Sequence, residues 1–367
     1  MKNYLNFEND IKDLELELDK LKDPYNKEGL SEVDTKRISE IQFEIDSKLS
    51  EVYSNLNSWQ ITQVARHEDR PKAKFFIENL FEEFIPLAGD RFYGEDKSVL
   101  AGLAKFNQTS VLVIGQEKGD DLNSRIERNF GMMRPEGYRK TIRLMKLADK
   151  FNIPIVLFID TPGAYPGVGA EERGQAEAIA KSIECCMELK VPTISIIIGE
   201  GGSGGAIALA SSNKILMFEN AIYSVISPEG CATILWRDPK KTLEAAEAMK
   251  LSSKDLLELG IIDEIIPEPL GGAHRDRDLT LNNARKLIQK NLDEMNLMSK
   301  DEIFSHRKKK FLSIGRSKGF ASSVESDKNL TVKESLLQKI ILKLQKFKFQ
   351  VIVLFFLLIA GLIYLFL

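Results

Sequence analysis

Three apolar runs, each followed by a glycine-containing loop and a helical pattern, constrain the fold of this chain more than any other feature. Each run is apolar at successive positions, which is the pattern of a strand buried on both faces. The runs cover residues 109–114, 153–159 and 191–198. The helical patterns after them cover residues 138–150, 171–189 and 206–211. This repeated order predicts an α/β fold with its helices outside the sheet and with ligands at the carboxyl ends of the strands.

The loop after the third run holds five glycines: from Gly199 to Ala206 it reads GEGGSGGA. Consecutive glycines allow positive φ angles and let a ligand approach the main chain closely. The first N–H groups of a helix have no partner within the helix, and the helix dipole favours negative charge beside them. The loop is therefore suited to hold an anion through main-chain amides.

Two nucleotide-binding motifs compete for this loop. A phosphate-binding P-loop is excluded, because Gly205 stands where its lysine should be. A dinucleotide fingerprint, GxGxxG, fits residues 199–204 formally, and Glu219 lies at the distance expected of its acid. A three-glycine match inside a run of five glycines is a weak signal, and the dinucleotide interpretation stays as an alternative.

A nucleophile elbow, GxSxG, also fits residues 201–205 and would make Ser203 the nucleophile of a serine hydrolase. Such an enzyme needs a base, and the chain has three histidines. Of these, His274, in the loop after the α/β core, follows the serine in the usual order, with Asp263 as a possible acid. The simpler interpretation is that Ser203 is a small residue tolerated in a tight turn.

The loop after the second run, residues 160–169, reads DTPGAYPGVG. Its prolines stiffen it, and its glycines let the backbone curve around a ligand. Glu171 and Glu172 follow in the first turn of a helix, where the helix dipole alone explains them. No HExxH, CxxC or other paired metal-ligand spacing occurs, so we predict no metal site. Main-chain amides without an obvious side-chain catalyst indicate oxyanion stabilisation of a thioester or amide-like substrate.

The two ends of the chain differ in character. Residues 8–58 carry Leu and Ile at helical spacing, with a break at residues 22–24, and this predicts two antiparallel helices. Residues 351–367 are uncharged and about long enough to span a bilayer. Lysines precede this run and no charge follows it, so we expect a tail anchor with the body of the protein on the cytoplasmic side.

These patterns divide the chain into six segments. They are a helical segment (1–58), an α/β core (59–270), a second helical segment (271–315), a flexible linker (316–335), a basic amphipathic helix (336–350) and a transmembrane anchor (351–367). The formal net charge of −3 gives no sign of a nucleic-acid-binding surface. Three cysteines cannot build a disulfide framework, which favours a reducing compartment such as the cytoplasm.

Six longer motifs resemble the carboxyltransferase alpha subunit of bacterial and plastid acetyl-CoA carboxylase. They are LAGDR (87–91), RNFGMMRPEGYRK (128–140), FIDTPGAYPGVGAEERGQ (158–175), IGEGGSGGA (198–206), YSVISPEGCA (223–232) and IIPEPLGGAHR (265–275). The resemblance covers residues 4–315, and residues 259–266 are similar to the closing segment of the crotonase superfamily. The tail from about Arg316 has no counterpart in the family pattern.

The resemblance implies a crotonase-like spiral of ββα units that pairs with a beta subunit of the same fold, as an α2β2 assembly. It also implies that a carboxyl group moves from carboxybiotin, on biotin carboxyl carrier protein, to acetyl-CoA. The product is malonyl-CoA for fatty acid biosynthesis. An ATP-using biotin carboxylase belongs to the same complex. The beta subunit chiefly binds the CoA thioester and carries the family's zinc ribbon, so this chain alone should be inactive.

The resemblance also implies roles for residues of the two loops. The N–H groups of Gly204 and Gly205 would form the oxyanion hole for the ureido group of biotin. Carboxybiotin would lie beside Gly163, Ala164, Tyr165, Gly201 and Gly202. Biotin itself would take the acetyl proton, which agrees with the scarcity of side-chain bases in these loops.

Overall fold

The computed structural model describes residues 3–315 except 24, 27–28 and 31–33. The predicted linker (316–335), amphipathic helix (336–350) and anchor (351–367) lie outside the described residues. Within the part of the chain that is described, no helix has both the length and the apolar character needed to cross a bilayer.

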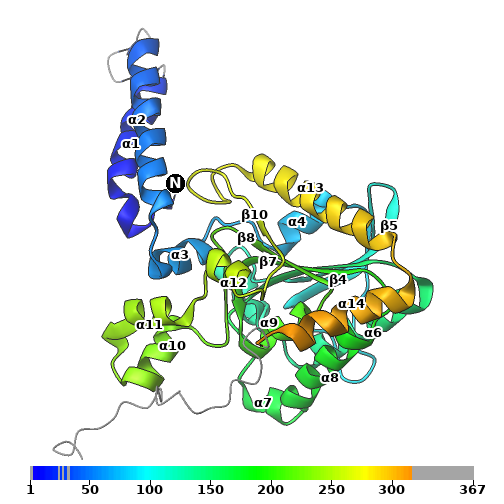
Figure 1. The fold of residues 1–367 in the computed structure, drawn as a ribbon. Coiled ribbons are helices and arrows are strands. Elements are labelled where there is room, and N and C mark those ends of the chain that lie inside the picture. The colour runs from blue at the N-terminus through cyan, green and yellow to red at the C-terminus, as the bar shows by residue number, and fades with distance from the viewer. Residues whose placement is uncertain (1–2, 24, 27–28, 31–33, 316–367) are drawn as a thin grey trace, which may run out of the picture. The chain divides into compact units, whose positions relative to one another are not determined.

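Two long helices precede the core, α1 (Asn9–Lys22) and α2 (Thr35–Ser54), and they lie side by side (Figure 1). All seven apolar positions used to predict them belong to one cluster between the helices: Leu14, Leu18, Leu21, Ile38, Ile41, Ile45 and Leu49. A short strand pair, β1 (Tyr25–Asn26) and β2 (Gly29–Leu30), lies between them in the sequence. Arg275 joins α1 to the core: its guanidinium donates to Glu15 of α1 at 2.5 Å and to Glu8, the N-cap of α1, at 3.0 Å. The two predicted helices are confirmed.

The core is built on one eight-stranded sheet in the order β10-β8-β7-β6-β5-β4-β3, with β9 paired to β7. Its strands are β3 (Glu82–Pro86), β4 (Val99–Phe106), β5 (Thr109–Gln116), β6 (Ile155–Thr161), β7 (Thr193–Gly202), β8 (Lys214–Phe218), β9 (Ile222–Ser224) and β10 (Glu264–Ile266). The three predicted strands are β5, β6 and β7, which are adjacent and parallel. Because they are parallel, the loops after them meet at one edge of the sheet.

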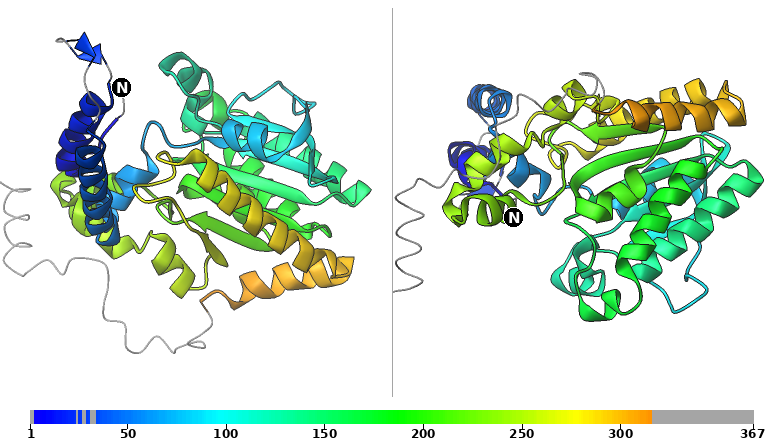
Figure 2. Two further views of the ribbon diagram at one scale, coloured as in Figure 1. Left: turned by 90° about the horizontal axis from the view of Figure 1, so that it is seen from above. Right: turned by 60° about the horizontal axis from the view of Figure 1, so that its bottom comes forward.

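Helices cover both faces of this sheet, as Figure 2 shows. On one face α6 (Pro135–Phe151) packs against α8 (Gln175–Glu188), and α13 (Arg277–Asn296) lies on the other. The predicted α/β arrangement is thus confirmed. The remaining α-helices are α3 (Ser58–Ala65), α4 (Ala73–Leu80), α5 (Leu122–Glu127), α7 (Val168–Glu171), α9 (Ser203–Ala210), α10 (Pro228–Cys231), α11 (Thr242–Met249), α12 (Ser253–Glu258) and α14 (Lys300–Ser313).

Two helical stretches differ from the sequence prediction. The stretch expected at 171–189 is divided between α7 and α8, because Gly174 adopts a left-handed conformation with φ +80°. The helical pattern expected from Leu279 to about Arg307 is two helices, α13 and α14. Ser299 caps the second of these in a reciprocal capping box with Glu302, which starts a new helix.

Candidate active site

The glycine loop forms the junction between β7 and α9. Gly201 and Gly202 end the strand, and Ser203 begins the helix with φ +52°, a left-handed conformation that is unusual for a residue with a side chain. Gly202, the N-cap, has no side chain that could bond to the first turn. The N–H groups of Ser203, Gly204 and Gly205 therefore have no partner from within α9 or from a capping side chain, and they are available to an acceptor outside the helix.

The two predicted loops pack backbone against backbone. A Cβ built on Gly205 would lie 2.6 Å from the carbonyl carbon and oxygen of Gly163 and 3.0 Å from the nitrogen of Ala164. A Cβ on Gly202 would collide with the backbone of Pro162. Glycine is thus required at both positions by close approach of the main chains. The structure brings Gly163 and Ala164 to Gly205, as the placement of the loops at one sheet edge requires.

Tyr165 is held in the same loop by contacts to residues at the N-termini of α6 and α8. The guanidinium of Arg134 lies over its ring, 4.5 Å from the centroid. Its backbone N–H donates to Met133 O at 3.1 Å. The buried side chain of Gln175 donates to the carbonyl oxygens of both Met133 and Tyr165, at 2.9 and 3.0 Å. These bonds fix the backbone of Tyr165 while its half-buried ring remains at the rim of the site.

A buried set of charges lies directly behind the glycine loop, and sequence reasoning missed it. Glu200, 6% exposed, accepts from Arg66 Nε and Nη2 at 3.0 and 2.7 Å. Lys118 Nζ lies 2.7 Å from Asp160 Oδ1 and 3.4 Å from Glu200 Oε2. Burial by itself would raise the pKa of Glu200, but the charges of Lys118 and Arg66 hold it below its usual value. The carboxylate of Glu200 therefore stays ionised although it is buried near the end of β7.

Gln116 is a second missed residue, at the end of β5. Its fully buried side chain donates from Nε2 to Gly205 O at 2.8 Å and accepts at Oε1 from the N–H of Asp160 at 3.3 Å. One side chain thus joins the start of α9 to the end of β6. A glutamine at the end of an otherwise apolar buried run was the available sequence signal, because such a group must find hydrogen-bond partners.

The residues of the predicted hydrolase are not brought together. The ring of His274 stacks on that of His67, with centroids 3.8 Å apart. Asp263 accepts from the backbone N–H of Ile215 at 2.6 Å and pairs with Lys310. Among the described residues no hydrogen bond joins Ser203 to a histidine. The serine-hydrolase alternative is therefore wrong, because each proposed partner is engaged elsewhere in the fold.

The sequence also raised a dinucleotide site with Glu219 as its acid, and it predicted no metal site. Glu219, the acid of the dinucleotide alternative, accepts at its carboxylate from the backbone N–H of Glu268 at 3.3 Å. Within the described residues, no group of three or more His, Cys, Asp or Glu side chains could hold a metal ion.

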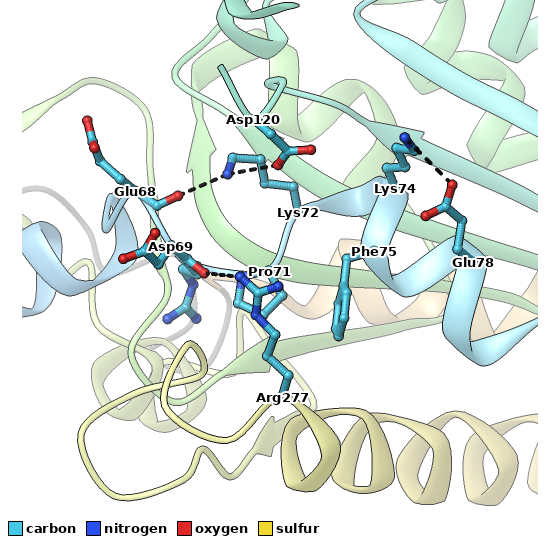
Figure 3. A pocket seen from close by; sticks show the side chains of 10 residues that line it. Glu68, Asp69, Pro71, Lys72, Lys74, Phe75, Glu78, Asp120 and Arg277 are labelled. Atoms are coloured by element: carbon cyan, nitrogen blue, oxygen red, sulfur yellow. Dashed lines mark hydrogen bonds and ion pairs between the residues drawn. The ribbon is translucent and has the colours of Figure 1, made fainter. Parts of the chain in front are cut away.

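A cavity of about 310 Å³ lies beside α4 (Figure 3), and none of the residues that line it belongs to either glycine loop. Its lining holds equal numbers of acidic and basic side chains, and two pairs form among them: Lys72 lies 3.2 Å from Asp120, and Lys74 lies 3.7 Å from Glu78. Arg277 donates to the main-chain oxygen of Asp69 at 3.1 Å. The balance of acids and bases gives the cavity no excess charge of one sign with which to hold an ionic ligand.

Comparison with known proteins decides the family. Residues 4–315 match the family described as acetyl co-enzyme A carboxylase carboxyltransferase-like. The chain belongs to this family. Within the acetyl-CoA carboxylase carboxyltransferases it is an alpha subunit: it is 77% identical over 355 residues to the carboxyl transferase subunit alpha of Pelagibacter ubique, covering 97% of this chain and 96% of that protein. The alpha subunit of Zymomonas mobilis is 52% identical over 316 residues, which are 86% of this chain and 100% of that protein.

The carboxyltransferase family match ends at residue 315, as expected. The match to the P. ubique subunit covers so much of this chain that it extends well into the tail. The tail is therefore shared with at least one alpha subunit, although the sequence pattern of the family gave it no counterpart.

Two solved structures of transcarboxylase 12S share the carboxyltransferase fold. They have TM-scores of 0.51 and 0.52 at 19% and 18% identity. They cover 62% and 66% of this chain and 42% and 45% of the transcarboxylase chains. At this identity the likeness concerns the fold alone.

Proposed function

We propose that this alpha subunit, with a beta subunit, transfers the carboxyl group of carboxybiotin to acetyl-CoA and so forms malonyl-CoA for fatty acid biosynthesis. The observation that carries the proposal is the set of main-chain N–H groups at Gly204 and Gly205, at the start of a helix that has no capping side chain. The family and the alpha-subunit relatives support the same reaction. The crotonase-like spiral of ββα units is part of the proposal.

The N–H groups of Gly204 and Gly205 act as the oxyanion hole. Carboxybiotin, when bound, supplies the carboxyl group and then a base for the acetyl proton. The two N–H groups donate to the ureido oxygen, and the positive end of the helix dipole adds to their effect. Gly163, Ala164, Tyr165, Gly201 and Gly202 line the biotin side of this hole. Gly202 and Gly205 leave the space that the neighbouring loop occupies, so the donors stay fixed before the substrate arrives.

The chain is proposed to work within a larger complex. The relatives are named as subunits, which supports a requirement for partners. The partners are the beta subunit in an α2β2 assembly, the biotin carboxyl carrier protein, and a biotin carboxylase that uses ATP. The beta subunit holds acetyl-CoA, and this chain presents the oxyanion hole to biotin.

Co-expression with the beta subunit of the same organism tests this function. We expect the two chains to co-purify and to form malonyl-CoA from acetyl-CoA and a carboxybiotinylated carrier, with neither chain active alone. An assembled complex that forms no malonyl-CoA would overturn the proposal. Covalent labelling by a fluorophosphonate that is lost in Ser203→Ala would also contradict the proposal, because it would show that Ser203 is a nucleophile.

The C-terminal tail is proposed to anchor the complex at the cytoplasmic face of the inner membrane through residues 351–367. The proposal rests on the sequence of this run, on the lysines before it, and on the match of the P. ubique subunit into the tail. In a carbonate wash of membranes, the full chain should stay in the pellet and a chain lacking residues 351–367 should be released. Release of the full chain would contradict the anchor.

A further inference from the structure

The strand that leads into the glycine loop contains a bulge at the level of Asp160. Ile159 pairs with Ile197, but Thr161 pairs with Gly201, so Asp160 alone opposes three residues of β7. A bulge leaves main-chain groups without their ladder partners. Here side chains supply them: the N–H of Glu200 donates to Asp160 Oδ1 at 2.9 Å, and Arg70 Nε donates to Ile198 O at 2.7 Å.

Lys118 holds the two acids of this bulge together. Its Nζ contacts Asp160 at 2.7 Å and Glu200 at 3.4 Å, while both acids are at most 6% exposed. Arg66 contacts Glu200 and also Glu229, at 2.6 Å, and does not share Asp160. Without Lys118, Asp160 and Glu200 would be two neighbouring buried carboxylates, with Arg66 paired to Glu200 and not to Asp160, and their repulsion would open the bulge.

We propose that Lys118 and Asp160 are positioning residues that fix the register at which Gly201–Gly205 leave β7, and thereby the direction of the oxyanion-hole N–H groups. Each residue of a strand advances the chain by about 3.4 Å, so a bulge that closed or slipped by one residue would carry both N–H groups out of place. A misplacement of about 1 Å is enough to lower a rate by about 10²-fold. The inference rests on the proposed function, because the effect on rate is read from carboxyl transfer.

A small cavity beside this cluster makes the inference testable by chemical rescue. About 150 Å³ of space is lined by Lys118, Asp160 and Arg66, and also by Lys72. The variant Lys118→Ala would enlarge this space next to Asp160. A small alkylammonium ion such as ethylammonium fits there and restores the missing positive charge.

The experiment measures kcat and KM for acetyl-CoA with the assembled complex of this chain and the beta subunit. We expect Lys118→Ala to lower kcat by about 10²-fold while KM changes less than about twofold, since the thioester is held by the partner. Added ethylamine should restore kcat in a saturable way. Lys72→Ala is the matched control: Lys72 lines the same cavity, but in the described part of the chain its ammonium bonds to the main-chain oxygen of Glu68 and the exposed Asp120, not to Asp160 or Glu200 (Figure 3). It should keep the wild-type kcat and show no response to ethylamine.

Each outcome decides one of the two claims. An inactive wild-type complex would contradict the proposed function, whereas an active wild type with a normal Lys118→Ala kcat would overturn the positioning role alone. A kcat loss that merely follows the loss of assembled complex would overturn it too. If Lys118→Ala does not fold, two variants of Asp160 replace it. Asp160→Asn keeps an oxygen for the Glu200 N–H, and Asp160→Ala does not, so kcat should be at least about tenfold higher in Asp160→Asn; equal values would refute the role.

Discussion

Gly205→Ala tests whether the close approach of the two loops sets the rate. The new Cβ would lie 2.6 Å from the carbonyl of Gly163, whereas non-bonded carbon atoms prefer about 3.5–4.0 Å, so the loops must separate by about 1 Å. Overpacking of this kind costs about 1–3 kcal/mol of unfolding free energy. The same movement turns an N–H group away from the ureido oxygen. The loss of one oxyanion donor costs about 2.7–4 kcal/mol, or about 10²–10³ in kcat.

The assay is malonyl-CoA formation by purified complexes with the beta subunit, with the amount of assembled complex measured by size exclusion. Gly94→Ala is the matched control, because nothing lies within 4 Å of a Cβ there. At Gly204 a Cβ would meet only Ile179, at 3.5 Å, so Gly204→Ala should fold normally and lose less activity than Gly205→Ala. A fully assembled Gly205→Ala complex with kcat within about twofold of wild type would show that the close approach of the loops does not set the rate.

Three further predictions concern stability and Ser203. Burial, and then the charge of His67, lower the pKa of His274 from 6.5 to about 2, so the unfolded chain takes up a proton below pH 6.5 that the folded chain does not. The unfolding free energy should therefore fall as the pH decreases below 6.5, and the contribution of His274 to this slope approaches about 1.4 kcal/mol per pH unit. Urea titrations of His274→Asn should lack this contribution, and an unchanged slope would contradict the lowered pKa of His274. Arg307 is fully buried and donates to the carbonyls of Leu189 and Val191 at 2.6 and 3.1 Å. Arg307→Leu should cost about 2–5 kcal/mol of unfolding free energy in urea denaturation, and the exposed Arg37→Leu should cost much less; equal costs would count against the buried bonds. Ser203→Ala should keep kcat within about threefold of wild type, since the proposed donors are main-chain groups, and a loss of about 10³-fold would restore a chemical role for the hydroxyl.

The sheet and its helices were predictable because they follow local patterns. Apart from the exposed Thr109 and Ser110, the runs that became β5, β6 and β7 are buried on both faces, and such runs have few alternatives to a central parallel strand. The glycine loops were predictable for the same reason: Gly202 and Gly205 lie where main chains touch, which only glycine permits. Their position at one sheet edge follows from the parallel order of the strands.

The charges behind the loop were not predictable in this way. Asp160 and Glu200 are visible as acids at the ends of buried strands, and a buried acid must have a partner. Their partners, Lys118 and Arg66, come from distant parts of the sequence. No local pattern pairs them, and only the order of strands in the sheet brings them together. The bulge at Asp160 was not predictable for the same reason, because the register of β6 against β7 depends on which distant side chains bond to the main-chain groups of the bulge.

The most direct test of the main-chain oxyanion hole is a structure of the complete α–β complex with biotin bound. We expect the ureido oxygen to lie about 2.7–3.1 Å from the main-chain nitrogens of Gly204 and Gly205, with both N–H groups directed at it. A ureido oxygen held instead by a side chain, with those nitrogens turned away or covered by protein atoms, would contradict this expectation.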